Sequence, residues 1–252
     1  MMPKGTLYLV PNGLDVGTAD ADLGERLPLG TLRVAARLGH WVSENAKTTR
    51  AFLKRVDAVC PLAIALQQIA IVELPRPAKG RPDTEAFEGD RLLQPAHAGS
   101  DLGLISEAGL PAVADPGARL VAAAHAAGVR VVALPGASSI TLAVAASGLN
   151  GQSFAFVGYL PIEADARTAR IRELEATSRR LGQTQVMIET PYRNGALFGA
   201  LLAQLQPTTV LSISVGLTLA GESTRSEPVQ RWRASPGTLA ADVPAVFSFL
   251  AR

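Results

Sequence analysis

The sequence predicts an α/β protein of two domains, with a parallel five-stranded sheet in the N-terminal domain and a mixed sheet in the C-terminal domain. In the first half, short β-branched and aliphatic runs alternate with longer segments of helical periodicity, which is typical of β-α-β units. After Pro135-Gly136, strand-like runs follow one another more closely. The chain has 252 residues, of which 48% are hydrophobic, and this is enough for two separate cores. We therefore expect domains at residues 1–136 and 137–252.

Five strands are expected in the N-terminal domain, at residues 6–10, 40–43, 69–73, 102–105 and 129–134. Helical periodicity covers roughly residues 29–38, 47–56 and 117–127. In the second of these helices, Phe52, Leu53 and Val56 fall on one apolar stripe. Strands joined by helices pair in parallel, so these segments predict a doubly wound sheet.

The C-terminal domain is expected to contain strands at residues 154–157, 185–188, 210–215, 229–232 and 245–250. Helices are expected at about 163–180 and 193–204, the first with an apolar stripe of Ile171, Leu174 and Leu181. Neighbouring strands without a crossover helix must pair antiparallel. The prediction for this domain is therefore a mixed sheet.

Composition excludes several classes of protein. The single cysteine, Cys60, rules out an internal disulfide framework, and His40, His97 and His125 are too scattered for a local metal site. No apolar run approaches the ~20 residues of a membrane helix, and the amino terminus does not resemble a secretion signal. We expect a soluble cytoplasmic protein without a metal and without membrane contact.

Glycine and proline are concentrated in the loops that follow the first, fourth and fifth strands, at residues 10–15, 106–117 and 134–139. Open parallel sheets bind ligands at the carboxyl ends of their strands. Glycine lets a backbone approach a ligand closely, so these loops suit an adenosine-type ligand held mainly by main chain. No phosphate-binding P-loop, G-x-G-x-x-G dinucleotide motif or G-x-S-x-G nucleophile elbow is present.

The same loops resemble those of the tetrapyrrole methylase superfamily of S-adenosylmethionine-dependent methyltransferases, and most closely its 16S rRNA cytidine 2′-O-methyltransferase branch. Residues 5–10 read G-T-L-Y-L-V, as in that branch. Residues 106–117 match S-D-A-G-T-P-x-I-S-D-P-G, with Glu107 for Asp and Leu110 for Thr. Residues 134–138 match L-P-G-P-S, and residues 189–193 match E-S-P-H-R.

This resemblance implies a tetrapyrrole-methylase-like fold of two α/β domains that holds S-adenosylmethionine in the cleft between them. It also implies a homodimer, and ribosomal RNA or the small ribosomal subunit as the partner. Carried over residue by residue, the cofactor contacts fall on Pro11, Ala108, Gly109, Leu110, Val113, Ser138, Ser139, Glu189 and Leu217.

A ribose hydroxyl becomes a good nucleophile only as its proton leaves, so a nearby carboxylate is expected to assist methyl transfer. The candidates are Glu44, Glu107 and Asp15, each in or beside a loop at the expected ligand-binding edge. The alternative for each carboxylate is that it caps a helix or pairs with an arginine.

Arginine supplies 20 of the 24 basic residues, which suits contacts with oxyanions. Candidate phosphate contacts are Arg50, Arg167, Arg170, Arg179 and Arg180. The alternative is a solvated helix face, because acidic residues are interspersed among the last four of these. Aromatic residues make up 5% of the chain, and no aromatic-rich stacking surface is visible in the sequence.

The substrate-side segments depart from the rRNA branch. Its A-E-D-T-R-x-T motif becomes Ser-Glu-Asn-Ala-Lys-Thr-Thr at residues 43–49, and its H-E-H-N segment has no counterpart. Two alternatives to ribose methylation therefore stay open: methylation of a tetrapyrrole or other small molecule, and binding of S-adenosylmethionine without catalysis.

Overall fold

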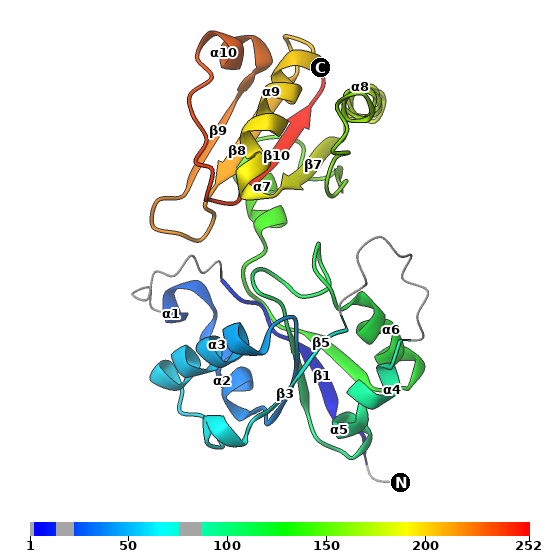
Figure 1. The fold of residues 1–252 in the computed structure, drawn as a ribbon, viewed down its shortest axis with the longest axis vertical. Helices are drawn as coiled ribbons and strands as arrows, with labels where there is room; N and C mark the ends of the chain where they lie inside the picture. Colours follow the sequence, from blue (N-terminus) through cyan, green and yellow to red (C-terminus); the bar gives the residue numbers. More distant parts are fainter. Residues whose placement is uncertain (1–2, 14–22, 76–86) are drawn as a thin grey trace. The chain divides into compact units, whose positions relative to one another are not determined.

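The computed structural model describes residues 3–13, 23–75 and 87–252 (Figure 1). The chain divides into two compact units, Met1–Ser138 and Ser139–Arg252. Each unit contains one five-stranded sheet with helices packed on it. Within the described residues, no helix is both long enough and apolar enough to cross a membrane.

The first unit contains a parallel five-stranded sheet, as predicted, and its strand order is β3-β2-β4-β1-β5. Its elements are β1 (Thr6–Leu9), α1 (Leu23–Arg26), α2 (Leu29–Arg37), β2 (His40–Ser43), α3 (Ala46–Val59), η1 (Leu66–Gln68), β3 (Ala70–Glu73), α4 (Gly89–Leu92), α5 (Gln94–His97), β4 (Leu102–Ile105), α6 (Ala118–Ala126) and β5 (Arg130–Ala133). Figure 1 shows α1, α2 and α3 on one side of this sheet, and α4 and α6 on the other. The sheet is therefore doubly wound.

Two apolar clusters fill the two faces of this sheet. On the face covered by α2 and α3, Trp41 stacks edge-on against Phe52 with ring centroids 6.3 Å apart, and both side chains are buried. The Trp41 ring lies so close to Gly103 in β4 that a Cβ there would come within 2.6 Å of the ring. Phe52, Leu53 and Val56 are fully buried, which confirms the predicted stripe of this helix.

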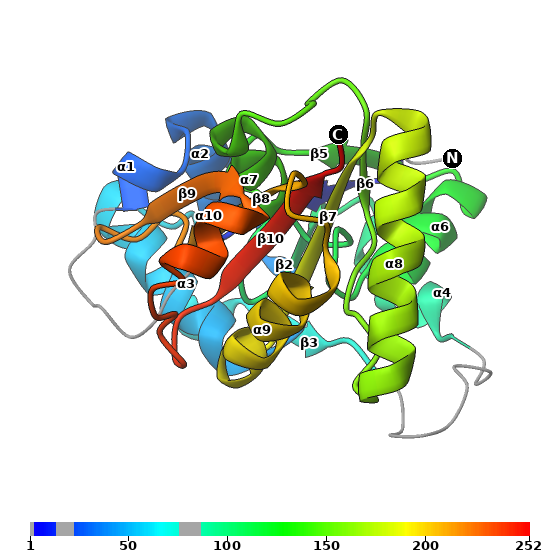
Figure 2. The same ribbon diagram turned by 90° about the horizontal axis from the view of Figure 1, so that it is seen from above.

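The second unit contains a mixed sheet, as predicted, and its strand order is β6-β7-β10-β8-β9. Its elements are α7 (Ser139–Ser147), β6 (Phe154–Phe156), α8 (Ala164–Leu181), β7 (Thr184–Glu189), η2 (Pro191–Arg193), α9 (Asn194–Gln204), β8 (Val210–Val215), β9 (Ser223–Pro228), α10 (Val229–Ala234) and β10 (Ala245–Leu250). Only β6 and β7, which α8 connects, pair in parallel; the other neighbours are antiparallel. Figure 2 shows α8, α9 and α10 beside the strands of this sheet.

One local expectation for the second unit was wrong, and two elements of this unit were not predicted. Residues 229–232 form the start of α10 instead of a strand, because Val229 and Trp232 are buried one helical turn apart and the Trp232 indole N–H donates to the Leu211 carbonyl (2.8 Å). Strand β9 was not expected because its sequence is polar and ends in a proline, which an edge strand tolerates. Helix α7 was not expected either, because it is rich in β-branched and small residues.

The predicted apolar stripe of α8 is only partly correct. Ile171 and Leu174 are buried, but Leu181, the last residue of the helix, is 50% exposed. The buried face continues through Glu175 instead, whose carboxylate accepts hydrogen bonds from the Gln206 amide (2.8 Å) and the Thr209 hydroxyl. A buried carboxylate with such partners fixes the loop before β8 and does not face a ligand.

Candidate functional site at the carboxyl edge of the first sheet

Three loops meet at the carboxyl edge of the first sheet because β2, β4 and β1 are neighbours in it. Glu44 and Asn45 follow β2, Ser106 follows β4, and Pro11 and Asn12 follow β1. Parallel strands end at the same edge, so residues distant in sequence become adjacent here.

A small antiparallel bridge joins the loops after β1 and β4. The Asn12 amide donates to the Gly109 carbonyl (2.9 Å), and the Gly109 amide donates to the Asn12 carbonyl (2.7 Å). The Asn12 side chain donates a further bond to the Glu107 carbonyl (2.8 Å), while its Oδ1 is buried without a hydrogen-bond partner. The bridge holds the loop after β4 in place and leaves one acceptor unsatisfied.

The loop after β4 adopts an unusual backbone conformation. Ala112 and Ala114 have φ angles of 67° and 63°, and Gly109 and Gly117 have 76° and 129°. For alanine, the left-handed conformation costs roughly 1–2 kcal/mol per residue. Such strain accumulates at ligand-binding sites, where surrounding contacts enforce it. A Cβ on Gly109 would meet no atom within 4 Å, so this part of the loop borders open space.

The loop after β5 packs against the loop after β1. A Cβ on Gly136 would come within 2.3 Å of the Pro11 ring, so only glycine fits this contact. The Thr31 hydroxyl donates to the Pro135 carbonyl (2.7 Å) and ties the same loop to α2. Pro11 is itself buried, which leaves its backbone, more than its ring, for contact with a ligand.

Two of the predicted carboxylates, Glu44 and Glu107, lie together at this edge. The Glu107 amide donates to Oε2 of Glu44 (3.3 Å), and the Asn45 side chain donates to Oε1 of Glu107 (3.0 Å). Asn45 also caps α3 through its Oδ1, which accepts from the Lys47 amide (2.9 Å). The third predicted carboxylate, Asp15, lies outside the residues that the structure describes.

Asp115 is a carboxylate of this site that the sequence reasoning missed. Its pKa is raised to about 6, chiefly by burial, and the charges of Glu44 and Glu107 contribute to the rise, while a hydrogen bond with Ser106 opposes it. Asp115 stands in the matched 106–117 segment, but nothing in its spacing singled it out. Within the described ranges, no set of His, Cys, Asp and Glu side chains is arranged to hold a metal ion.

Comparison with known proteins identifies the family. A family model described as Tetrapyrrole (Corrin/Porphyrin) Methylases matches residues 45–230. The chain belongs to this family. The match begins just before α3 and ends within α10, so it includes the loop after β4 and most of the second unit.

Curated relatives of this chain carry the name Ribosomal RNA small subunit methyltransferase I. The Pseudomonas aeruginosa protein is 30% identical over 192 residues, which are 76% of this chain and 59% of the relative. The Micromonospora olivasterospora protein is 32% identical over 202 residues, which are 80% of this chain and 56% of the relative. The aligned residues thus span just over half the length of these relatives.

Solved structures agree with the tetrapyrrole methylase fold. A uroporphyrin-III-C-methyltransferase from Thermus thermophilus superposes with a TM-score of 0.54 at 22% identity, covering 98% of this chain and 94% of that one. The methyltransferase CobJ gives a TM-score of 0.57 at 14% identity, covering 98% of this chain and 100% of that one. At these identities the likeness concerns the fold alone.

In the second unit, two more predicted cofactor contacts lie at the ends of strands β7 and β8, which β10 separates. Glu189 ends β7 and is 6% exposed; its carboxylate accepts from the Thr190 amide (2.8 Å) and pairs with Arg193 (2.8 Å). Leu217 follows β8 and packs against the apolar cluster that includes Ile140 and Val186. The Glu189 carboxylate is therefore engaged within its own loop.

The remaining predicted cofactor contacts are distributed between the two units. Ala108, Leu110 and Val113 belong to the strained loop of the first unit, where Val113 is 41% exposed. Ser138 ends the first unit, and Ser139 begins α7 in the second.

The predicted RNA-contacting arginines occupy two helices. On α8, Arg170 pairs with Glu173 (2.7 Å), Arg167 donates to the Ile162 carbonyl (3.2 Å), and Arg179 donates to the Arg252 carbonyl (3.2 Å). Arg180, also on α8, is exposed. On α3, Arg50 is exposed and makes a long contact with the Ala46 carbonyl (3.5 Å). Surface contacts of this kind are weak, so these guanidinium groups can exchange them for phosphate.

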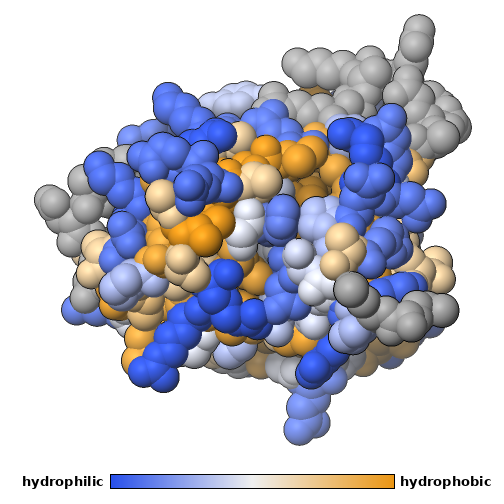
Figure 3. Space-filling model, turned by 90° about the horizontal axis from the view of Figure 1, so that it is seen from below, coloured by the Kyte–Doolittle hydropathy of each residue, from blue (hydrophilic) through white to orange (hydrophobic). Residues whose placement is uncertain are grey.

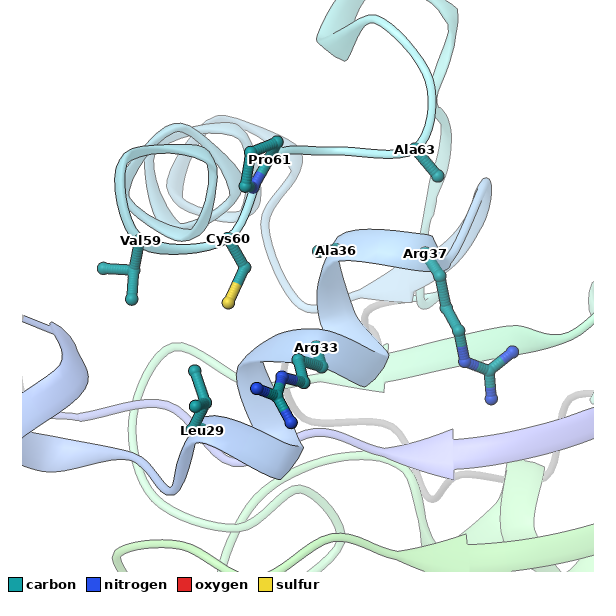
Figure 4. Close-up of a pocket in the computed structure, with 8 residues that line it drawn as sticks. All are labelled: Leu29, Arg33, Ala36, Arg37, Val59, Cys60, Pro61 and Ala63. Carbon is teal, nitrogen blue, oxygen red and sulfur yellow. The ribbon is translucent and has the colours of Figure 1, made fainter.

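A separate hollow of about 500 Å³ lies between α2 and the end of α3 (Figure 4). It is lined by Leu29, Arg33, Ala36, Arg37, Val59, Cys60, Pro61 and Ala63. Its Arg37 guanidinium is held by Asp101 and by the Tyr8 hydroxyl (2.7 Å). Asp101 precedes β4, so this end of the hollow lies near the amino edge of the sheet, away from the loops described above.

Proposed function

We propose that this protein is an S-adenosylmethionine-dependent methyltransferase that methylates a ribose 2′-hydroxyl of small-subunit ribosomal RNA. Family membership supports methyl transfer, and the names of the curated relatives support the RNA substrate. One observation supports the proposal most strongly. The carboxylates of Glu44, Glu107 and Asp115 lie close together at the loop after β4, whose backbone is strained and borders open space.

The residues at this edge fit S-adenosylmethionine. The buried Oδ1 of Asn12 lacks a hydrogen-bond donor, and the adenosine and amino-acid parts of the cofactor carry N–H and O–H donors. The backbone around Gly109 has room for a ligand. We assign cofactor binding to Pro11, Ala108, Gly109, Leu110 and Val113, with Ser138, Ser139, Glu189 and Leu217 as further contacts. When bound, the cofactor supplies an activated methyl group on its sulfonium.

Asp115 is the best candidate for the proton acceptor in the proposed reaction. The ribose oxygen forms its new bond to the methyl carbon as the carbon–sulfur bond breaks, and the hydroxyl proton passes to a carboxylate. A carboxylate with a pKa of about 6 is a stronger base than an ordinary one, yet it is mostly ionised at neutral pH. Glu44 and Glu107 support this role by raising the pKa of Asp115.

Phosphate contacts are assigned to Arg50 and to the four α8 arginines named above, because RNA affinity depends chiefly on such cations. The curated relatives are bacterial, and bacterial ribosomes lie in the cytoplasm, so we place this protein there. We also propose a homodimer. Apolar side chains such as Leu29, Ile64 and Val72 are exposed on the first unit, and Figure 3 shows apolar patches among hydrophilic residues on the face in view.

The deciding experiment is a methyl-transfer assay with labelled S-adenosylmethionine and two acceptors, small ribosomal subunits and a uroporphyrinogen-type tetrapyrrole. We expect label in the RNA only, and digestion to nucleosides should locate it on a ribose. Label in the tetrapyrrole would replace the RNA assignment with the small-molecule one. If calorimetry shows that the protein binds the cofactor but neither acceptor is methylated, the protein is a non-catalytic S-adenosylmethionine-binding protein. Sedimentation at micromolar concentration tests the dimer, and a species of 26.3 kDa alone would contradict it.

A further inference from the structure

Two tyrosines distant in sequence lie at one edge of the second sheet. β6 and β7 are parallel neighbours, so the segments that follow them leave the sheet at the same edge. The Ile188 amide donates to the Gly158 carbonyl (3.2 Å), which places Tyr159 beside the end of β7. Tyr192 follows β7 in the short helix η2.

These tyrosine side chains are highly accessible. Tyr159 is 58% exposed and Tyr192 is 75% exposed, with Ile162 at 70% on the same segment as Tyr159. In the described part of the chain every other aromatic residue is less exposed, and Phe154, at the opposite end of β6, follows at 40%. Single exposed apolar residues are ordinary, whereas a group of them at one edge indicates a binding surface.

The charged groups around these tyrosines are mixed. Arg167 donates to the Ile162 carbonyl (3.2 Å), which brings a guanidinium to the segment after β6, and its Nε is buried without a partner. Arg193 lies next to Tyr192 and pairs with Glu189. Glu163 and Asp165 are exposed close to Ile162. Charge alone therefore does not make this edge a phosphate site, and its aromatic rings are its distinguishing feature.

We propose that Tyr159 and Tyr192 form a stacking platform for unpaired nucleobases of the RNA substrate, an inference that rests on the proposed function. Proteins recognise RNA mainly through unstacked bases, which pack on aromatic side chains. A platform next to the Glu189 loop holds unpaired bases that flank the target nucleotide. Arginine beside an aromatic ring is a common companion in such sites.

The test is binding of a short unpaired RNA that carries a fluorescent adenine analogue, whose emission is quenched when it stacks. Tyr192→Ala and Tyr159→Ala are each expected to weaken binding by about 5-fold to 150-fold, the range found for the loss of one stacked base. Both changes should also reduce the quenching at saturation. Tyr192→Trp and Tyr159→Phe should keep the wild-type RNA affinity and quenching, because each variant retains an aromatic ring although it lacks the tyrosine hydroxyl.

Phe154→Ala is the matched control, since it removes an exposed ring from the other end of β6. It should leave affinity and quenching unchanged. Stacking releases no counterions, so the tyrosine variants should keep the wild-type dependence of affinity on salt.

The outcomes separate this proposal from the proposed function. If the wild-type protein binds and methylates RNA but the tyrosine variants match it in affinity and quenching, the platform is wrong and the function stands. If the wild-type protein neither binds nor methylates RNA, both fail. A change in sedimentation without a change in RNA affinity would show a contact between protein chains instead, and would also overturn the platform.

Discussion

The amide of Glu107 donates a hydrogen bond to the carboxylate of Glu44 over 3.3 Å, across 63 residues of sequence. The bond links the loop after β4 to the end of β2 and places two negative charges near Asp115. An acidic group beside other carboxylates holds its proton more tightly. The bond therefore connects the packing of the first sheet to the acid–base chemistry proposed for the site.

The first prediction concerns the proton acceptor. Asp115→Asn should lower the rate of methyl transfer by about 100-fold or more, because an amide cannot accept the hydroxyl proton. The wild-type rate should rise with pH through about 6 as Asp115 ionises, and the variant should lose this rise. Asp90→Asn on the exposed face of α4 is the control. Equal rates and pH profiles for wild type and Asp115→Asn would exclude this role.

The second prediction concerns stability. The pKa of Asp115 is about 6 in the folded protein against an ordinary 3.8, so the ionised carboxylate destabilises the fold. This destabilisation is complete above pH 6, falls as the pH drops, and vanishes below pH 3.8. Because Asp115 is partly exposed, solvent screening limits this loss of unfolding free energy to about 1 kcal/mol.

Urea unfolding at pH 8 should therefore show Asp115→Asn to be more stable than wild type, with the difference disappearing near pH 4. Trp41 lies in the first unit and Trp232 in the second, so a Trp232→Phe background reports the first unit by fluorescence. A difference that does not change with pH would contradict the assigned titration.

The third prediction concerns the loop after β4. Gly109→Val should abolish S-adenosylmethionine binding, because the new side chain projects into the space next to the loop. Gly148→Val is a matched control: Gly148 also has a positive φ (67°) and no atom within 4 Å of a Cβ. Both changes should cost roughly 1–2 kcal/mol of stability, but only the first should affect calorimetric binding. Glu107→Ala should matter less if the contacts are mainly backbone, and equal losses for Gly109→Val and Glu107→Ala would argue against this arrangement.

The fourth prediction concerns the core of the first unit. Gly103→Ala places a Cβ 2.6 Å from the Trp41 ring, so the ring or the strand must move. Overpacking of this kind costs about 1–3 kcal/mol. Gly199→Ala in the middle of α9 meets no atom within 4 Å and should stabilise the second unit by roughly 0.5–1 kcal/mol. Thermal unfolding should show a lower melting temperature for the Gly103 variant and a higher one for the variant in α9. An unchanged melting temperature for Gly103→Ala would contradict the tight fit of β4 against Trp41.

The fifth prediction concerns RNA affinity. Changing Arg167, Arg170, Arg179 and Arg180 together to glutamine should weaken RNA binding and flatten its salt dependence by about one unit per lost phosphate contact. Cofactor binding should be unchanged. Replacement of Arg91 and Arg231, exposed arginines outside α8, is the control. If affinity and salt dependence stay at wild-type values, the α8 arginines are a solvated face.

Much of the fold could be predicted because the pattern of apolar residues matched the period of each element. The bounds of β4, β8 and β10 are as expected, since each is a short apolar run with a clear beginning and end. Helix α10 could not be predicted in this way. In the sequence, Val229 and Trp232 are as compatible with a strand as with a helix. The hydrogen bond from the Trp232 indole to the Leu211 carbonyl, which favours the helix, forms only in the folded protein.

The site was predictable only in part. Motif resemblance located the loops, but the role of Asp115 depends on burial and on charges from β2 and β4 that meet only in the folded sheet. Likewise, Tyr159 and Tyr192 come to the same edge of the second sheet through the parallel pairing of β6 with β7. Neither the charges around Asp115 nor the shared edge of the two tyrosines can be inferred from neighbouring residues in the sequence.

The central place of β10 in the second sheet affects the order in which the protein can be made. β10 separates β7 from β8, and both hydrogen-bond to it along most of their length. During synthesis, β6 to β9 leave the ribosome before the strand that joins them into one sheet. All five strands of the first sheet come before Ser138. Until β10 has been synthesised, β7 and β8 each expose an unpaired strand edge. We expect the nascent chain to depend most on chaperones during this interval.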